Sequence, residues 1–280
     1  MISVAVIGAG ELGGLVAHVL ARRDAAAEIR LIDDAGNIAA GMALDITQAA
    51  PVEQFATRVS ASADLAAAGG ATIVVIADRA KGGECQGDEG LTLLTRLLGL
   101  IGQAVIVCAG SQARELIERG VRELHVGRER LFGSAPEALT AAVRAIVALE
   151  VDGSPRDVAL TVAGVPPDHV VLSWDDAALG GFSAMRLLND VERRRIAARV
   201  PRLWPPGPYA LASAAAKVVE GVTQRSRAST SCFVAPDDSS GRRARVGALP
   251  VRLGPRGIEA IVLPELNARD RVVFENAMQL

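Results

Sequence analysis

The sequence predicts an α/β fold, in which a doubly wound parallel sheet is followed by an α+β region. In the first half of the chain, short apolar runs alternate with helical patterns, which is typical of βαβ units. Half of the 280 residues are hydrophobic but only 3% are aromatic, so we expect a large aliphatic core. A glycine-rich turn separates the first apolar run from the first helical pattern.

Charge and cysteine content exclude several function classes. The formal net charge of −2, from 30 basic and 32 acidic residues, gives no electrostatic footprint for nucleic acid or an anionic membrane. Three cysteines without C-x-x-C spacing predict neither a disulfide framework nor a metal site. The most apolar stretch, Leu91–Gly110, contains Arg96, Gln103 and three glycines, so we expect no membrane span. These features favour a cytoplasmic protein.

The strands expected in the first half are short, rich in valine and isoleucine, and bounded by turns. Such runs are typical of strands that are buried on both faces of a sheet. Between the first two runs, Leu12, Val16, Val19 and Leu20 form one apolar stripe, which predicts an amphipathic helix. The expected strands are Ser3–Ile7, Glu28–Ile32, Thr57–Ser60, Thr72–Ala77, Ala104–Cys108 and Arg130–Phe132.

The second half has a different pattern, so we place a domain boundary between residues 134 and 135. Helices are expected at Pro136–Leu149, Asp190–Val200 and Tyr209–Thr223, with a last helix capped by Asn267. Strands are expected at Asp157–Val162, His169–Ser173, Thr230–Ala235, Ala244–Leu253 and Gly257–Val262. This order predicts an α+β region in which the last three strands are antiparallel.

A glycine motif gives the first half a functional interpretation. Gly8-Ala9-Gly10-Glu11-Leu12-Gly13 fits G-x-G-x-x-G directly after a strand and at the start of a helix, as in a Rossmann-type sheet. Gly8 allows the tight turn, Gly10 lets backbone approach a pyrophosphate, and Gly13 lets the helix pack closely on the strand. Asp33 follows 20 residues later, at the spacing where a carboxylate binds a ribose and repels a 2′-phosphate. The motif therefore predicts binding of NAD.

Several further stretches resemble one known family. They are Leu31-Ile32-Asp33, Gly41–Ile46, Arg130–Ser134, Ser154–Val158 and the tail Leu249–Asn267. In this combination the sequence resembles the lactate/malate dehydrogenase family nearly end to end. The resemblance implies a Rossmann NAD-binding domain over 1–134 and a lactate/malate dehydrogenase-like α+β domain over 135–280. It also implies NAD-dependent interconversion of a 2-hydroxy acid and a 2-oxo acid, and a homodimer or homotetramer.

The same resemblance puts unreactive residues where the family has its catalytic groups. The family needs a histidine that carries the hydroxyl proton, an aspartate that orients it, and two arginines that bind the substrate carboxylate and polarise its carbonyl. In the family's G-E-H-G-D run, the histidine position holds Pro166. In its L-D-S-A-R-F-R run, the aspartate position holds Leu139 and the arginine position holds Ala142. The loop arginine falls on Gly90. No catalytic residue is therefore expected at the family positions.

Two stretches beside the expected cofactor also differ from the family. Its T-A-G run reads Ala77-Asp78-Arg79, which puts an acidic group near the phosphates, and its T-N-P turn reads Cys108-Ala109-Gly110. The remaining cofactor positions match. The expected cofactor-binding residues are Gly8, Gly10, Glu11, Leu12, Gly13, Asp33 and Ala77.

These replacements lead to three hypotheses. The leading one is an NAD(H)-binding pseudoenzyme of this family, for which we expect no conventional small-molecule substrate. The second is an active NAD-dependent oxidoreductase that acts on a CH–OH group with a rebuilt site, for which the substitute candidates are His169, Asp168, Arg79 and Lys81. The third is a non-catalytic structural or partner subunit.

Overall fold

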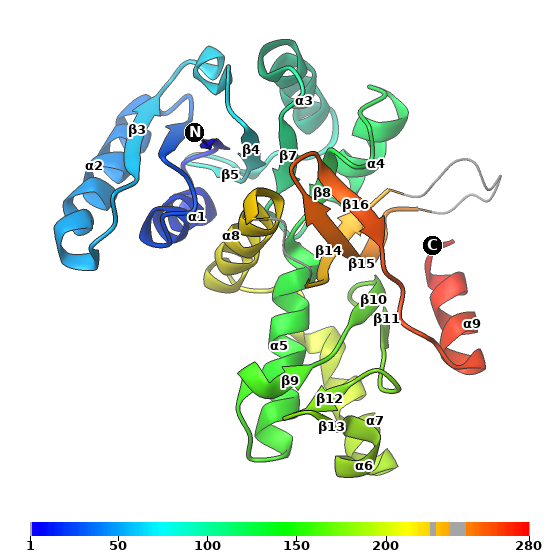
Figure 1. The fold of residues 1–280 in the computed structure, drawn as a ribbon. Helices are drawn as coiled ribbons and strands as arrows, with labels where there is room; N and C mark the ends of the chain where they lie inside the picture. Colours follow the sequence, from blue (N-terminus) through cyan, green and yellow to red (C-terminus); the bar gives the residue numbers. More distant parts are fainter. Residues whose placement is uncertain (1, 225–227, 236–244, 280) are drawn as a thin grey trace.

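The computed structural model describes residues 2–224, 228–235 and 245–279, and the largest sheet in this part of the chain has 11 strands (Figure 1). Its N-terminal half is parallel and has the strand order β3-β2-β1-β4-β7-β8. This order, with the first strand near the centre, is that of a doubly wound nucleotide-binding sheet, so the predicted fold class is confirmed. The strands are β1 (Ser3–Ile7), β2 (Glu28–Ile32), β3 (Arg58–Ser62), β4 (Ile73–Ile76), β7 (Val105–Cys108) and β8 (Leu131–Gly133).

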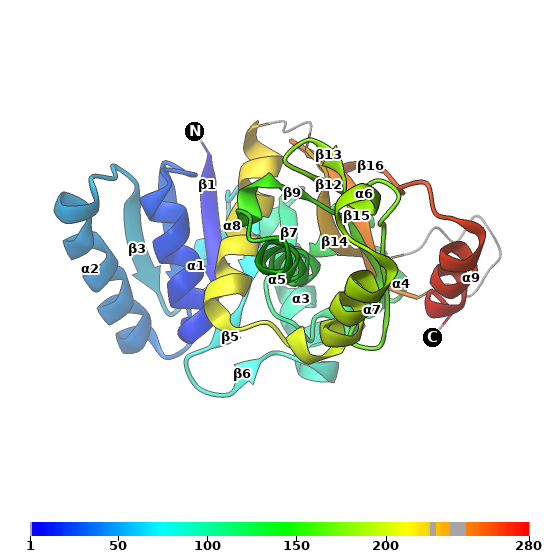
Figure 2. The same ribbon diagram turned by 90° about the horizontal axis from the view of Figure 1, so that it is seen from below.

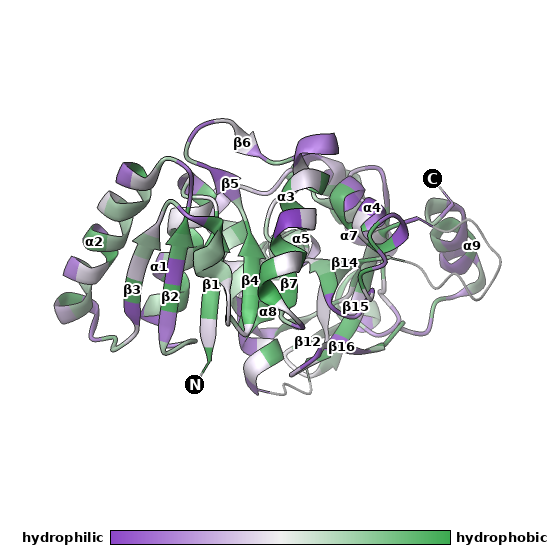
Figure 3. Ribbon diagram, turned by 90° about the horizontal axis from the view of Figure 1, so that it is seen from above, coloured by the Kyte–Doolittle hydropathy of each residue, from purple (hydrophilic) through white to green (hydrophobic). Residues whose placement is uncertain are grey.

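Helices cover the parallel half of the sheet. α1 (Glu11–Arg22) packs against α2 (Gly36–Glu53) and α8 (Pro208–Gln224) (Figure 2), while α3 (Gly87–Ile101) packs against α4 (Arg114–Arg122). Because helices screen the central strands from water, every residue of β4 and β7 is buried. Figure 3 shows these two strands as continuously hydrophobic. This burial explains why they appear in the sequence as unbroken apolar runs.

The sheet continues without interruption into the second half of the chain. β14 (Thr230–Val234) pairs antiparallel with β8, and β15 (Gly247–Gly254), β10 (Val162–Val165) and β11 (His169–Leu172) follow. β16 (Gly257–Ile261) pairs with β15. The predicted boundary at residues 134 and 135 therefore falls between β8 and the long helix α5 (Ala135–Glu150), within a shared sheet. The strand expected from Ala244 begins at Gly247 in the structure, and Ala244 lies outside the described residues.

The single strand expected over Asp157–Val162 is wrong. The structure has two strands there, β9 (Val158–Ala159) and β10, which belong to different sheets. Between them the backbone oxygen of Leu160 accepts hydrogen bonds from the guanidinium of Arg144 on α5. The chain leaves one sheet and enters the next at this point. β9 pairs with β12 (Ala178–Leu179), which pairs with β13 (Phe182–Ser183).

The helices expected over Pro136–Leu149, Asp190–Val200 and Tyr209–Thr223 are present as α5, α7 (Asp190–Arg199) and α8. The core is aliphatic, as the composition predicts. At the last helix, Asn267 Oδ1 accepts a hydrogen bond from the N–H of Asp270 at 3.0 Å, which confirms the predicted cap. Within the described residues, no helix is both long and apolar enough to cross a membrane. The remaining helices are η1 (Leu65–Ala68), η2 (Pro155–Asp157), α6 (Ala184–Leu187), η3 (Val200–Leu203) and α9 (Ala268–Ala277).

Candidate functional site

The glycine turn lies at the carboxyl end of β1, in the middle of the parallel sheet. Gly8 has φ +105°, a conformation that side chains rarely adopt, and its N–H donates to the backbone oxygen of Ile32 at 2.7 Å. α1 begins three residues later. A Cβ on Gly13 would lie under 3.0 Å from the backbone of Gly8, so this helix packs on the turn as closely as the sequence motif predicts.

Asp33, at the end of β2, is buried and fixes the backbone around this turn. Its Oδ2 accepts hydrogen bonds from the N–H groups of Ala9 at 2.8 Å and Ala80 at 2.9 Å, and its Oδ1 accepts one from Ala35 at 2.8 Å. Burial by itself would raise the pKa of this carboxyl, but the hydrogen bonds from Ala80, Ala9 and Ala35 hold the pKa below its ordinary value. The residue predicted to bind a ribose therefore also has a structural role.

We expect Asp33→Asn to lower the free energy of unfolding by about 2–3 kcal/mol at neutral pH, because hydrogen bonds to a charged acceptor contribute about that much. The pKa of Asp33 is lower in the folded protein than in the unfolded chain. Its stabilisation is therefore complete above the unfolded pKa and is lost as the pH falls through the folded pKa. Urea unfolding at a series of pH values measures both effects, and the difference from wild type should shrink in acid.

The matched control for this measurement is Asp45→Asn. Asp45 is exposed on α2, so its replacement should change the free energy of unfolding by no more than about 0.5 kcal/mol. An equal loss of stability in the two variants would contradict the role of Asp33.

A short hairpin that the sequence did not predict lies across the glycine turn. It consists of β5 (Asp78–Arg79) and β6 (Gly83–Glu84). The backbone oxygen of Asp78 accepts from the N–H of Gly10 at 2.9 Å, and its Oδ1 accepts from the N–H of Gly13 at 2.9 Å. The carboxylate therefore lies at the N-terminus of α1, where free N–H groups and the helix dipole favour an anion.

The other end of the hairpin is fixed by a second carboxylate. Glu84 accepts hydrogen bonds from the N–H groups of Ser111 and Gln112, each at 3.0 Å, in the turn that follows β7. A Cβ on Gly110 would collide with this side chain. Asp78 and Glu84 thus connect one hairpin to the ends of two central strands.

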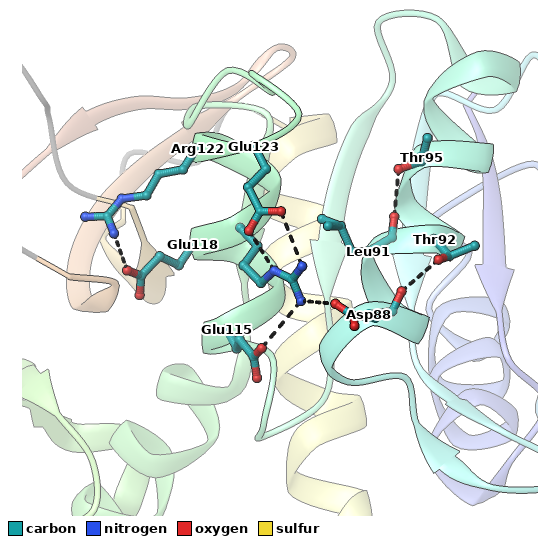
Figure 4. Close-up of polar contacts among 9 residues, drawn as sticks. Asp88, Leu91, Thr92, Thr95, Glu115, Glu118, Arg122 and Glu123 are labelled. Carbon is teal, nitrogen blue, oxygen red and sulfur yellow. Dashed lines mark hydrogen bonds and ion pairs between the residues drawn. The ribbon is translucent and has the colours of Figure 1, made fainter.

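Two cavities flank the hairpin. The first, of about 520 Å³, lies between the ends of β1 and β2 and helix α3, and its lining includes Gly8, Asp33 and Arg79. Its volume is in the range of small-molecule sites. At its rim, Asp88 accepts a hydrogen bond from Arg119 Nη1 at 2.9 Å, which connects α3 to α4 (Figure 4).

The second cavity, of about 410 Å³, lies between the hairpin and the start of α8. Three acidic residues line it, namely Glu11, Asp78 and Glu84, and no arginine or lysine is among its described lining residues. The charged side chains that a bound carboxylate or phosphate would meet in this lining are all negative. Such a cavity is unfavourable for an anionic substrate.

With this geometry in view, the chain can be compared with known proteins. Residues 2–96 match the family model described as the lactate/malate dehydrogenase NAD-binding domain. The malate dehydrogenase of Salinibacter ruber is 25% identical over 98% of this chain and 93% of its own length. That of Thioalkalivibrio sulfidiphilus is 26% identical over 99% of this chain and 96% of its own.

Solved structures show the same fold. A malate dehydrogenase structure from Salinibacter ruber has a TM-score of 0.87 at 23% identity, and it covers 99% of this chain and 94% of its own. A malate dehydrogenase from Aeropyrum pernix has a TM-score of 0.88 at 20% identity, with coverage of 99% and 95%. The fold similarity therefore extends over both halves of the chain.

NAD is the cofactor of the matched lactate/malate dehydrogenase domain, and the site of this chain fits it in part. The tight turn at Gly8, the close packing at Gly13 and the carboxylate of Asp33 are retained. The carboxylate of Asp78, in contrast, accepts a hydrogen bond from the N–H of Gly13 at the N-terminus of α1. This is where a pyrophosphate would bind. The site as described has room beside the turn but not at the phosphate position.

The positions expected to correspond to the family's catalytic groups carry no titratable side chain. Leu139 is fully buried in the second apolar cluster, and Pro166 is buried at the end of β10. Ala142 is half-buried on α5. Gly90 lies in the first turn of α3, where a Cβ would lie 2.9 Å from the backbone oxygen of Cys85. A proline, a leucine, an alanine and a glycine can neither transfer a proton nor bind a carboxylate.

The structure does not bring the substitute candidates together. Arg79 lines the 520 Å³ cavity and is paired with Glu89. Lys81 is exposed at the tip of the hairpin, whereas Asp168 and His169 are exposed in and after the turn between β10 and β11. None of the last three lines either of the two cavities.

The thiol at the end of β7 does not supply a nucleophile. Burial raises the pKa of Cys108 to about 12, so the thiolate is not available near neutral pH.

Two carboxylates with important contacts were missed by sequence reasoning. Glu84 lies in a two-residue strand, which is too short to show a period. Glu137 is buried on α5, where it accepts hydrogen bonds from Lys217 and from the N–H of Ser231. Its partners lie 80 and 94 residues away, and a single sequence carries no signal for such pairs.

Proposed function

We propose that this chain is an NAD(H)-binding relative of the lactate/malate dehydrogenases that does not catalyse the family's reduction of 2-oxo acids. The observation that carries the proposal is the acidic cavity formed by Glu11, Asp78 and Glu84 beside the glycine turn. It offers no cation for a substrate carboxylate within its described lining. The residues at the expected catalytic positions support the same conclusion, because they lack any group that can carry a proton.

The loss of reaction rate that follows from the missing catalytic groups can be bounded. Positioned acid–base catalysis contributes about 10²–10⁴-fold to a rate. The removal of one electrostatic stabiliser costs about 10²–10³-fold more. Working enzymes turn over at about 1–10³ per second. A chain that lacks both contributions is therefore expected to turn over about 10⁴–10⁷-fold more slowly than a working enzyme.

The testing experiment combines binding with activity. NADH binding is measured by fluorescence and by the rise in melting temperature, since a ligand that binds only the folded state stabilises it. NADPH serves as the matched ligand, because the carboxylate of Asp33 should repel its 2′-phosphate. Oxidation of NADH is then followed with oxaloacetate and with pyruvate, alongside a malate dehydrogenase as positive control.

We expect binding of NADH in preference to NADPH, and no oxidation of NADH with either substrate. Turnover with oxaloacetate or pyruvate at ordinary enzyme rates would overturn the catalytic part of the proposal. The absence of any shift with millimolar NADH would overturn the binding part of the proposal and would favour a subunit that binds no nucleotide.

A further inference from the structure

We propose that Asp78 is an internal substitute for the cofactor's pyrophosphate, so that a dinucleotide binds only after this carboxylate of the β5–β6 hairpin has moved away from the glycine turn. The inference rests on the proposed NAD(H) site and concerns its selectivity. A ligand with a diphosphate must compete with Asp78, whereas an uncharged nucleoside need not.

The carboxylate of Asp78 lies where the glycine motif leaves space for a phosphate. Its Oδ1 accepts from the N–H of Gly13 at 2.9 Å, and the carboxylate lies under 3.0 Å from where a Cβ on Gly10 would be. Gly10 is the residue whose missing side chain lets backbone approach a pyrophosphate. The space that the motif keeps free for phosphate is therefore filled by an anionic group of the chain itself.

The hairpin that carries Asp78 is held at several points. The N–H of Ala80 donates to Asp33, the N–H of Gly10 donates to the backbone oxygen of Asp78, and Glu84 accepts two N–H groups after β7. These bonds come from both sides of the site. Together with the bond from Gly13, they hold the backbone and the carboxylate of Asp78 in a defined position, so a phosphate can enter only when this carboxylate is displaced.

The charged side chains around Asp78 do not offset its repulsion of a diphosphate. Glu11 and Glu84 line the same 410 Å³ cavity as Asp78. The neighbouring arginine, Arg79, is already paired with Glu89, with Nη2 3.1 Å from Oε2. A diphosphate that approached the closed hairpin would meet three carboxylates, and like charges at short range disfavour binding.

The adjoining 520 Å³ cavity is not blocked in this way. Gly8, Asp33 and Arg79 are among the residues that line it, whereas Asp78 is not. A nucleoside without phosphate can enter this space while the hairpin stays closed. The two classes of ligand should therefore respond differently to the loss of one carboxylate.

The test compares Asp78→Ala and Asp78→Asn with wild type. Isothermal titration calorimetry measures the dissociation constants of three probes, namely NADH, ADP-ribose and adenosine. Because the apparent affinity is reduced by the fraction of molecules in the competent state, we expect Asp78→Ala to bind NADH and ADP-ribose at least tenfold more tightly than wild type. Adenosine should bind with unchanged affinity. Asp78→Asn keeps the volume but removes the charge, so it should show an intermediate gain.

Controls separate charge at this position from net charge. Asp45→Ala changes the total charge by the same amount on the exposed face of α2, and its affinities should equal those of wild type. Circular dichroism confirms that each variant is folded, and Asp78→Asn retains an oxygen that can accept from Gly13 if the alanine variant does not fold.

The outcomes distinguish this inference from the function on which it rests. If wild type and both variants bind NADH equally tightly, the substitution of phosphate by Asp78 is wrong and the NAD(H) site stands. If neither wild type nor a folded variant binds NADH or ADP-ribose, the NAD(H) site itself is wrong. An equal gain for adenosine and for ADP-ribose would show that Asp78 does not act on the phosphates.

Discussion

Glu137→Ala is expected to lower the free energy of unfolding by about 3 kcal/mol, because it removes the centre of a buried polar network. Glu137 is only 3% exposed. Its two carboxylate oxygens accept hydrogen bonds from Lys217 Nζ and, at 2.9 Å, from the N–H of Ser231. Arg144 Nη1 lies 3.8 Å from the same carboxylate.

The loss of stability arises because the alanine would leave the hydrogen-bond donors around Glu137 without their acceptor. The N–H of Ser231 is buried, and a buried donor without an acceptor costs about 1–3 kcal/mol. Lys217 is less affected, since its side chain is 39% exposed and can turn to water. The network joins α5, α8 and β14, so its loss also weakens the contacts among these three elements of the second half of the chain.

Chemical denaturation of Glu137→Ala beside Glu220→Ala measures the effect. Glu220 lies on α8, like Lys217, and pairs with Arg23 at 3.2 Å, but this pair is near the surface. Exposed ion pairs contribute about 0–1 kcal/mol, so the control should remain close to wild type. If both variants lost the same small amount, the network around Glu137 would not be the structural link that the distances indicate.

The parts of the fold that could be predicted are those set by local pattern. Strand runs such as Ser3–Ile7 and the turn at Gly8 depend on burial and backbone geometry within a few residues. The sheet switch after Ala159 could not be predicted, because it depends on a hydrogen bond from Arg144 to a backbone oxygen 16 residues away. Local periodicity carries no information about such a contact.

In the candidate site, too, local spacing could be predicted from the sequence but contacts between distant residues could not. The spacing from Gly13 to Asp33 correctly placed a carboxylate beside the glycine turn. It did not reveal that Ala80 would also donate to this carboxylate, or that a hairpin would cover the turn. The family resemblance predicted an acidic group near the phosphates, and in the structure the carboxylate of Asp78 is bonded to Gly13 at the start of α1. The role proposed for this carboxylate could be inferred only from the three-dimensional structure.

Gly13→Ala is expected to destabilise the protein by about 3 kcal/mol, at the upper end of what an added methyl group costs in a packed interior. The new Cβ would lie under 3.0 Å from two backbone atoms of Gly8. These atoms cannot rotate away, because the N–H of Gly8 is bonded to Ile32 and its φ of +105° defines the turn. Thermal and urea unfolding measure the loss.

Gly10→Ala is the matched control, because the same methyl group meets a different obstacle there. Its nearest neighbours would be the carboxylate atoms of Asp78, the end of a side chain, and a turn of this side chain away from its rotamer costs only about 1 kcal/mol. We therefore expect Gly10→Ala to remain much more stable than Gly13→Ala, although the two positions are three residues apart in one motif. Equal losses in the two variants would mean that the contact of α1 with the Gly8 backbone is looser than described. In that case the shape of the turn would not depend on the third glycine.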